Sequence, residues 1–355
     1  MATNEYAMIP LFEKFIKHSY NGKRLMPDGK RIKPQTINNY VYALHHLTEY
    51  ELHLKTKLRI KALGRGNNRA FLAEKNYWNF FYLHFTDFLY KKQDCYDNYV
   101  GSIIKVIRVF FNFLNKEMAI FTGGFYKSFY VYKEEIPIVT LLPEQLQFLI
   151  NDNNFKIGLA KPLQETKDIF VFGCTVALRI SDLFGLKFRD IEQIGDAYYI
   201  PIKTMKTNTP VSIKLPKYGI EIIEKFRKKS RGRKSIFPAI PPATFNKQIK
   251  RIAFLAGWIK DTGKLRSKRG VALELFFDKK NKQYRFCDLV TSHTMRRTAI
   301  TTMLMLGMKE HVVKKISGHA DNSKSFYRYV NLVQSYLDNE MDVVFDKLTK
   351  FKGRI

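Results

Sequence analysis

Residues 292–330 read SHTMRRTAITTMLMLGMKEHVVKKISGHADNSKSFYRYV and gather several functional side chains within one short stretch. His293 and Arg296 are three residues apart at the start of a predicted helix, so both are expected on one side of its first turn. His319 follows a glycine at the end of the next predicted helix, and two tyrosines lie on a third. No carboxylate cluster accompanies these side chains. This set of side chains is unusual for a hydrolase and suits a site that binds a phosphate.

The charge of the chain points to a polyanionic partner. The 355 residues include 61 Lys and Arg against 32 Asp and Glu, which gives a net charge of +29. A protein that is merely basic is the less favoured alternative, because such an excess costs self-repulsion that nothing offsets. The hydrophobic share of 45% and the aromatic share of 14% argue for packed cores and against disorder. The length predicts two domains, with three as the upper limit.

The sequence gives little indication of a membrane protein or of a metal-binding protein. There is no uninterrupted apolar run of about eighteen residues and no amino-terminal hydrophobic signal core, so we expect a cytoplasmic protein that does not bind membranes. Cys95, Cys174 and Cys287 are far apart and lack the spacing of metal ligands. We therefore expect no disulfide framework, no metal site and no cofactor.

The first 130 residues are predicted to form an all-helical domain. Apolar periodicity predicts helices over 9–20, 36–51, 76–92 and 97–118. Thr36 is the expected N-cap of the second helix, and Val41 is expected in its buried stripe. The many aromatic residues have helical spacing, which favours the core over stacking on bases. Residues 131–142 contain Pro137 and lack a helical period, so they are predicted to be an interdomain linker.

Three basic tracts, at 55–69, 225–234 and 264–285, are candidates for contacts with phosphates. For the first tract, a solvated loop is an equally favoured interpretation. The third is also β-prone and is interpreted as an insertion that reaches toward a partner. The candidate DNA-binding residues are Lys55, Lys57, Arg59, Arg65, Arg69, Lys228, Arg231 and Arg233.

Residues 143–355 are predicted to be helical with one β interruption. The segment 166–178 is apolar on nearly all sides and predicts a buried helix, while 196–215 reads as strand, turn and strand. Arg179 ends the buried helix and Lys206 lies at the tip of the hairpin. Taken alone, each has a structural explanation, since an arginine there suits the helix dipole and hairpin lysines are usually solubilising.

Taken together, these positions form an ordered set. The set is ALRISDLFGLKFRDI around Arg179, TMKTNTPVSI around Lys206, HTMRRTA at 293–299, SGH at 317–319 and SFYRYV at 325–330. This order resembles the tyrosine recombinase, or phage integrase, family, and in particular the integrases of bacterial mobile elements. One His-x-x-Arg motif alone would be a weak signal. Five elements in the same order and at compatible spacings are a specific one.

The resemblance implies a mainly α fold with a small β-hairpin or sheet, in two domains. Residues 1–130 would form an all-helical core-binding (SAM-like) domain, 131–142 the linker, and 143–355 the tyrosine-recombinase catalytic domain with a C-terminal tail helix. The implied function is site-specific recombination, in which DNA is cut and rejoined through a covalent 3′-phosphotyrosine without metal or ATP. The alternatives are a catalytically inactive DNA-binding protein of integrase fold, a type IB topoisomerase and a metal-dependent nuclease.

The resemblance also implies a role for each site residue. Two arginines would clamp the phosphate, a lysine would protonate the departing 5′ oxygen, two histidines would bind the phosphate and assist proton transfer, and a tyrosine would attack: Arg179, Arg296, Lys206, His293, His319 and Tyr329. The usual family pattern places the nucleophile nine residues after the Gly-His histidine, where this chain has Arg328. One extra residue in the turn ADNSK makes Tyr329 the expected nucleophile, with Tyr327 as the alternative.

The implied partners follow from the same resemblance. They are double-stranded DNA carrying specific recombination sites and further copies of the chain, in a homo-tetramer assembled on DNA; accessory DNA-bending proteins are additional candidates. Such a protein would be associated with the nucleoid. Residues 331–350 form an amphipathic tail that would dock on a neighbouring subunit. Packing of the tail on its own domain is the alternative.

Overall fold

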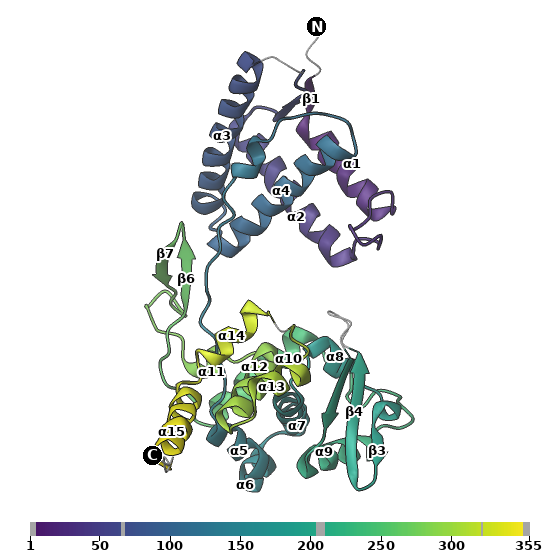
Figure 1. The fold of residues 1–355 in the computed structure, drawn as a ribbon, viewed down its shortest axis with the longest axis vertical. Coiled ribbons are helices and arrows are strands. Elements are labelled where there is room, and N and C mark those ends of the chain that lie inside the picture. Colours follow the sequence, from purple (N-terminus) through teal and green to yellow (C-terminus); the bar gives the residue numbers. More distant parts are fainter. Residues whose placement is uncertain (1–4, 65–67, 204–209, 321, 351–355) are drawn as a thin grey trace, which may run out of the picture. The chain divides into compact units, whose positions relative to one another are not determined.

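The computed structural model describes residues 5–64, 68–203, 210–320 and 322–350, which divide into two compact units (Figure 1). Unit 1 comprises Met1–Ile136 and Leu265–Leu275, and unit 2 comprises Pro137–Lys264 and Phe276–Ile355. Both are built mainly from helices, with small antiparallel sheets. The predicted fold class, mainly α with a small sheet, is confirmed. The segment 265–275 lies far along the sequence within the predicted catalytic domain, yet it belongs to unit 1.

The helices of unit 1 surround an aromatic core. They are α1 (Met8–Tyr20), α2 (Pro34–Leu54), α3 (Asn68–Lys91), α4 (Asp97–Lys116) and the 3₁₀ turn η1 (Phe125–Ser128). Strand β1 (Glu5–Ala7) pairs antiparallel with β2 (Arg59–Lys61). The indole of Trp78 meets the ring of Phe111 edge-on at 4.8 Å between centroids, a favourable aromatic geometry.

Two details of α2 differ from the sequence prediction. The helix begins at Pro34 with Lys33 as its N-cap, so Thr36 lies inside the first turn. Proline suits this first position because its fixed φ is already helical and its missing N–H would have no helical partner. Val41 is 46% exposed, because the buried face of α2 runs through Tyr40, Ala43 and Leu47 instead.

A close backbone contact fixes where the chain leaves unit 1. The carbonyl oxygen of Tyr132 lies so close to Gly101 in α4 that a Cβ there would collide with it. Only glycine leaves room for a backbone segment at such a distance. Gly101 therefore lets the extended segment after η1 run directly along α4.

The hairpin 265–275 is held on unit 1 by its turn. Strand β6 (Leu265–Lys268) pairs antiparallel with β7 (Val271–Glu274), and the connecting Arg269 and Gly270 have φ of +53° and +78°. Positive φ at both central residues is the type I′ geometry that matches strand twist in two-residue hairpins. The two turn amides donate to the buried carboxylate of Asp97, at 2.7 Å and 2.8 Å.

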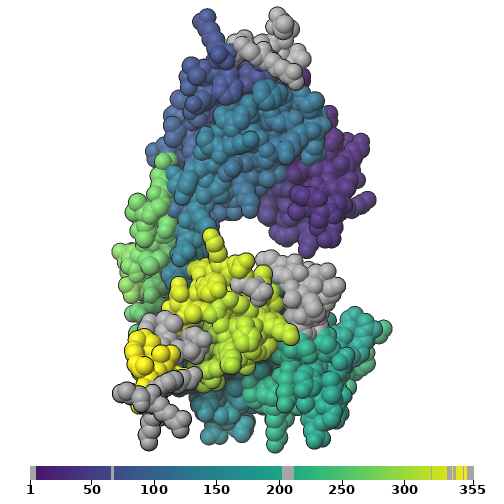
Figure 2. Space-filling view, in the orientation of Figure 1, coloured from purple at the N-terminus to yellow at the C-terminus, as the bar shows by residue number. Residues whose placement is uncertain are grey.

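A second buried acid anchors the first strand of the hairpin. Glu134 receives hydrogen bonds from Arg266 Nε and Nη2, at 3.0 Å and 2.7 Å, and from the amide of Ser267 at 2.5 Å. Burial opposes the charge of Glu134, but the bonds from Arg266 and Ser267 outweigh it, so the pKa of Glu134 lies below its usual value. In the space-filling view the hairpin, in green, lies against the blue surface of unit 1 (Figure 2).

Unit 2 places a small sheet beside a helical core. Strands β3 (Glu192–Ile194), β4 (Ala197–Lys203) and β5 (Pro210–Lys214) form an antiparallel sheet in that order. The helices are α5 (Pro143–Asn151), α6 (Asn153–Gly158), α7 (Lys161–Val176), α8 (Ile180–Gly185), α9 (Lys217–Lys228), α10 (Pro242–Leu255), α11 (Phe286–Leu289), α12 (Ser292–Met305), α13 (Glu310–Ser317), α14 (Lys324–Val330) and α15 (Gln334–Lys350), with a 3₁₀ turn η2 (Phe188–Asp190).

Helices α7 and α12 cross closely at the centre of unit 2 (Figure 1). Gly173 in α7 meets the side chain of Met295 in α12, with no space for a Cβ between them. The predicted burial of α7 is confirmed from Thr166 to Val176, apart from the half-buried Thr175. Within the described part of the chain, no helix is long and apolar enough to cross a membrane.

We expect Gly101→Ala to destabilise unit 1, because its Cβ would push the carbonyl of Tyr132 away from α4. Overpacking of this kind costs about 1–3 kcal/mol. Gly124→Ala is the matched control, since that glycine has open space around it and a negative φ. Urea unfolding of both variants measures the effect. Equal stability of the two variants would contradict the close contact.

We expect Glu134→Gln to destabilise unit 1 by about 2 kcal/mol at neutral pH. This is below the value for a fully buried pair, because 23% of the Arg266 side chain is exposed. Since the folded pKa of Glu134 is depressed, its contribution is present above the ordinary pKa of 4.5 and is lost as pH falls through the folded pKa. The difference in unfolding free energy between the wild type and Glu134→Gln, measured with urea, should therefore become smaller at acid pH. The control is Glu224→Gln in the exposed pair with Arg227, which should change little.

Candidate active site

Helix α12 carries the first two predicted site residues. Thr291 is its N-cap, and the Thr291 amide donates to the hydroxyl of Thr294 at 3.0 Å. His293 in the first turn is exposed, whereas Arg296 is 5% exposed. The two side chains predicted to share one side of the helix therefore differ in environment, with the histidine at the surface and the arginine inside.

The guanidinium of Arg296 is fixed by two helix ends. Nη1 donates to the carbonyl of Ala177 at 2.8 Å, just after α7, and Nη2 donates to the carbonyl of Ser317 at 2.6 Å, the last residue of α13. Carbonyls at helix C-termini lack helical partners and carry partial negative charge, which suits a buried cation. Ala177 adopts a left-handed φ of +54°, a conformation that alanine rarely takes.

Arg179 brings a second guanidinium close to the first. It is the N-cap of α8, and its Nη1 is buried without a hydrogen-bond partner among the described residues. Burial and the charge of Arg179 lower the pKa of Arg296 to about 10, so Arg296 remains cationic at neutral pH. A buried donor without a partner is costly, and two close cations repel each other. An anion would relieve both costs.

One acid near the arginines was missed by the sequence analysis. Asp182 lies in α8, is 5% exposed, and its negative charge acts to raise the pKa of Arg296. It partly balances the two cations within the fold. Its signal in the sequence was its position three residues after Arg179, where the helix brings it to the same side.

A glycine turn places His319 beside Arg296. Gly318 has φ +62°, and the amides of Gly318 and His319 donate to the carbonyls of Lys315 and Lys314. This pattern is a Schellman motif, which favours glycine at its left-handed position. The turn explains why the histidine follows a glycine, and it leaves the His319 ring within 3.4 Å of Arg296 Nη2.

The environment of His319 keeps its imidazole neutral. Burial and the nearby charges of Arg296, Arg179 and Lys314 lower the pKa of His319 to about 4. Its Nδ1 lies 2.8 Å from the hydroxyl of Ser317. At neutral pH the side chain is therefore an uncharged hydrogen-bonding group between cations.

The two candidate tyrosines on α14 have different surroundings. The ring of Tyr329 is half-buried and lies 6.0 Å from the ring of His319, between centroids. Tyr327 is 46% exposed, and its hydroxyl accepts a hydrogen bond from Lys314 at 3.1 Å. The ammonium of Lys314 also lies over the Tyr327 ring, 4.4 Å from its centroid. Tyr329 is thus the tyrosine that lies against the histidine, while Tyr327 is held by α13.

Arg297, the residue after Arg296 in α12, is half-buried beside Tyr329. Burial lowers the pKa of Arg297, while the charge of Tyr329 and a hydrogen bond with its side chain oppose that shift. Lys206, the predicted general acid, lies outside the described residues. The structure therefore brings together Arg179, Arg296, His319 and Tyr329, with Arg297 as an additional neighbour.

The predicted DNA-binding residues divide into two groups. Lys55, Lys57, Arg69, Lys228 and Arg231 are exposed, and Arg65 lies outside the described residues. The other two, Arg59 and Arg233, are half-buried, and their guanidiniums have partners within the fold.

Arg59 and Arg233 each serve a structural role. Arg59 Nη1 lies 2.7 Å from the buried carboxylate of Glu74, and its guanidinium covers the ring of Tyr77. Arg233 donates to the backbone carbonyls of Ser235 and Ile236, both at 2.9 Å. A free surface charge can meet a phosphate, whereas these two groups already have partners.

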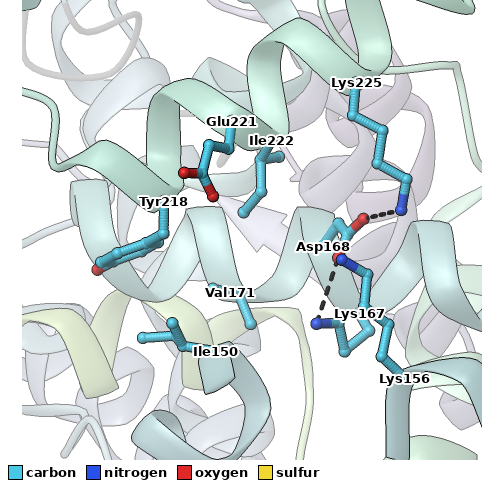
Figure 3. A pocket seen from close by; sticks show the side chains of 9 residues that line it. All are labelled: Ile150, Lys156, Lys167, Asp168, Val171, Tyr218, Glu221, Ile222 and Lys225. Carbon is cyan, nitrogen blue, oxygen red and sulfur yellow. Dashed lines mark hydrogen bonds and ion pairs between the residues drawn. The ribbon is translucent and has the colours of Figure 1, made fainter. Parts of the chain in front are cut away.

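A separate polar pocket lies among α5, α6, α7 and α9 (Figure 3). Its charged groups pair mainly with each other: Asp168 contacts both Lys167 and Lys225, and Lys167 also donates to the carbonyl of Leu149 at 2.8 Å. None of the predicted catalytic residues lines it. Elsewhere in the described ranges, no group of three or more His, Cys, Asp or Glu could hold a metal ion.

Known proteins with a similar fold share this architecture. The chain resembles the Tn1549 transposon integrase in complex with transposon right end DNA, with 13% identity, a TM-score of 0.58, and coverage of 95% of this chain and 99% of that one. It resembles a lambda integrase dimer bound to a COC′ core site, with 12% identity, a TM-score of 0.57, and coverage of 92% and 77%. The XerH site-specific recombinase bound to difH follows at 14% identity and a TM-score of 0.54, with coverage of 92% and 91%.

Identities this low establish the fold alone. No curated protein matches the chain. Its sequence, however, matches the Phage integrase family over residues 162–335, the part that carries Arg179, Arg296, His319 and Tyr329. This match confirms the resemblance found in the sequence, and the chain belongs to the phage integrase, or tyrosine recombinase, family.

Proposed function

We propose that this chain is a site-specific DNA recombinase that cuts and rejoins DNA through a covalent 3′-phosphotyrosine, without metal or ATP. One observation carries the proposal: the buried guanidinium of Arg296 and that of the half-buried Arg179, whose Nη1 is buried without a partner, share a site with a neutral histidine and a tyrosine ring. Such a site has excess positive charge and a buried donor without a partner in the described chain. A phosphodiester supplies the missing anion.

The arginines are suited to the transition state of phosphoryl transfer. In-line attack gathers negative charge on the non-bridging oxygens of the phosphate. Arg296 is held by two backbone carbonyls and needs no reorganisation to meet that charge. Arg179 offers its unpartnered Nη1. Planar, permanently charged guanidiniums can serve here in the way a divalent cation serves in other nucleases.

The remaining side chains have roles in the bonds that form and break during DNA cleavage. The hydroxyl of Tyr329 loses its proton and its oxygen bonds to phosphorus, while the bond from phosphorus to the 5′ oxygen breaks. Lys206 gives the departing 5′ oxygen a proton, and His293 and His319 bind the phosphate and assist proton transfer. The covalent link stores the bond energy. The 5′ hydroxyl of a second DNA can then attack it, which restores the tyrosine and exchanges the strands.

Domain roles follow from the same proposal. Residues 1–130 would bind the DNA core site, 131–142 would connect the domains, and 143–355 would carry catalysis and the tail helix. The exposed residues Lys55, Lys57, Arg69, Lys228 and Arg231 are the proposed phosphate contacts, with a steep salt dependence as the consequence. The similar Tn1549, lambda and XerH proteins are described as DNA complexes, which supports DNA as the partner.

The tail helix α15 supports assembly of several subunits. Its residues Met341, Val344, Phe345 and Leu348 are spaced to share one face of the helix, and each is more than half exposed. An apolar face that the described residues leave exposed suits a docking surface better than a core. We propose that it docks on a second copy of the chain within a tetramer on DNA, with accessory DNA-bending proteins as further candidate partners.

Covalent trapping on nicked DNA tests the proposed chemistry. On a nicked recombination site, the wild type should form a protein–DNA adduct in EDTA, because arginines rather than a metal neutralise the phosphate. Tyr329→Phe should bind the same DNA and form no adduct, as seen by denaturing gel electrophoresis. Loss of the wild-type adduct in EDTA would refute the metal-free mechanism.

Tyr327→Phe is the matched control, because it removes a hydroxyl from the same helix. This variant should still form the adduct, since the Tyr327 hydroxyl is bonded to Lys314 and not to the phosphate site. If Tyr327→Phe abolished the adduct while Tyr329→Phe retained it, the nucleophile would be Tyr327.

We expect Leu348→Asp to weaken assembly on DNA without lowering the melting temperature of the isolated chain. A charge on an apolar docking face costs affinity when the face is buried, but little while it remains in water. Mass photometry of the DNA complexes would report fewer multi-subunit species. Asp346→Asn, an exposed change on the same helix, is the control. A lower melting temperature for Leu348→Asp would instead show that the tail packs on its own domain.

A further inference from the structure

The hydroxyl of Ser317 has more potential partners than it has protons. Ser317 is 1% exposed, so water is not a ready partner. Its Oγ lies 2.6 Å from the carbonyl of Val313, one helical turn back, and 3.3 Å from that of Lys314. Carbonyl oxygens can only accept, so the single hydroxyl proton is donated along the helix. The remaining capacity of Oγ is as an acceptor.

This assignment fixes the proton on His319. Nδ1 of His319 lies 2.8 Å from the same Oγ, which is good hydrogen-bond distance. Because the hydroxyl proton points to Val313, the bond to histidine requires Nδ1 to be the donor. A neutral imidazole has one N–H, so Nε2 then carries the lone pair.

Arg296 does not donate a well-aligned hydrogen bond to the lone pair of Nε2. Its Nη2 is 3.4 Å from Nδ1 and 3.4 Å from Nε2, so it lies on the plane that bisects the two nitrogens. A donor aligned with the lone pair of Nε2 would be much closer to Nε2 than to Nδ1. Nη2 also donates at 2.6 Å to the carbonyl of Ser317, which is its principal bond. Nε2 therefore remains able to accept a proton.

We propose that Ser317 is a positioning residue that holds His319 as the Nδ1-protonated imidazole, so that Nε2 accepts the proton of Tyr329 during cleavage. The proposal rests on the proposed recombinase function and deepens it, because it separates His319 from a simple donor to the phosphate. The ring of Tyr329, 6.0 Å from that of His319, is the neighbouring proton source.

One proton moves between Tyr329 and His319 Nε2, forward in cleavage and back in rejoining. On cleavage it moves from the Tyr329 hydroxyl to Nε2 as the tyrosine oxygen bonds to phosphorus and the 5′ oxygen leaves. The resulting imidazolium faces Arg296, Arg179 and Lys314, which disfavour it while the site is empty. The phosphate anion offsets these charges, so His319 becomes an effective base only when DNA is bound. On rejoining, Nε2 returns the proton to the departing tyrosine oxygen.

Nitrogen-15 NMR of histidine-labelled full-length protein reads the tautomer directly. At neutral pH, without DNA, we expect the proton of His319 on Nδ1, with the signals assigned by their loss in His319→Gln. In Ser317→Ala, which removes the hydroxyl that accepts from Nδ1 together with its bond to Val313, a shift of the proton toward Nε2 is expected. A wild-type spectrum with the proton on Nε2 overturns the proposal, and it does so whether or not the protein cleaves DNA.

Single-turnover adduct formation supplies the functional measurement. Ser317→Ala should slow it by about ten- to a hundredfold with DNA binding unchanged, as is typical when an orienting partner of a histidine is lost. The acid limb of its pH profile should move to lower pH, because the imidazolium loses an acceptor. A purely structural defect would slow the reaction without moving this limb, and that outcome overturns the proposal, as does a wild-type rate.

Ser19→Ala is the matched control for folding. The Ser19 hydroxyl is also buried and also donates one turn back, to Phe15 at 2.8 Å, but it lies in unit 1. Comparable thermal stability of the two variants would separate lost catalysis from lost folding. Absence of any adduct from the wild type would refute the recombinase function while leaving the tautomer measurable by NMR.

Discussion

The buried guanidinium of Arg296 is the interaction on which the catalytic unit depends. Three helices meet at this one group: α12 supplies the side chain, and the ends of α7 and α13 supply the carbonyls of Ala177 and Ser317. Removing either carbonyl would leave a cation in the interior with an unsatisfied donor, which is among the more costly defects in a fold. The unusual left-handed backbone at Ala177 is consistent with this demand, because it directs a carbonyl toward the guanidinium.

The same arrangement connects stability with chemistry. A site with two close arginines is less stable empty than filled, since their repulsion and the unpartnered Nη1 of Arg179 persist until an anion enters. Asp182 moderates this repulsion without cancelling it. The fold therefore keeps two like charges close together, a repulsion that the proposed binding of a phosphate would relieve. Binding energy of this kind is most useful when the charge grows in the transition state.

Local sequence patterns predicted much of the fold. The helix expected over 97–118 appears as α4, Asp97–Lys116, because its apolar residues repeat at helical spacing. Long-range contacts were not accessible in the same way. Nothing near Arg59 in the sequence indicates that it pairs with Glu74 in α3. The burial of Asp182 likewise depends on tertiary packing.

For the candidate site, too, some features could be predicted from local sequence and others depended on the tertiary structure. The order of its motifs identified the family, and it also gave the proposed site residues, because the chemistry constrains residue type strongly. The choice between Tyr327 and Tyr329 depended on a turn whose length the sequence could not interpret, and the surroundings of the two rings favour Tyr329. The contrast between exposed His293 and buried Arg296 also required the three-dimensional packing of α12.

The hairpin 265–275 has a consequence for biosynthesis. Unit 1 contains two acids, Glu134 and Asp97, that accept hydrogen bonds from residues encoded more than a hundred positions later. During translation the N-terminal helices emerge first, and Asp97 can then accept only from Tyr90 nearby, yet the donors from the hairpin are missing until residue 275 has left the ribosome. The amino-terminal unit therefore cannot mature before much of the catalytic unit has been made. The nascent chain must therefore delay completion of unit 1, which links the appearance of a finished unit 1 to the synthesis of unit 2.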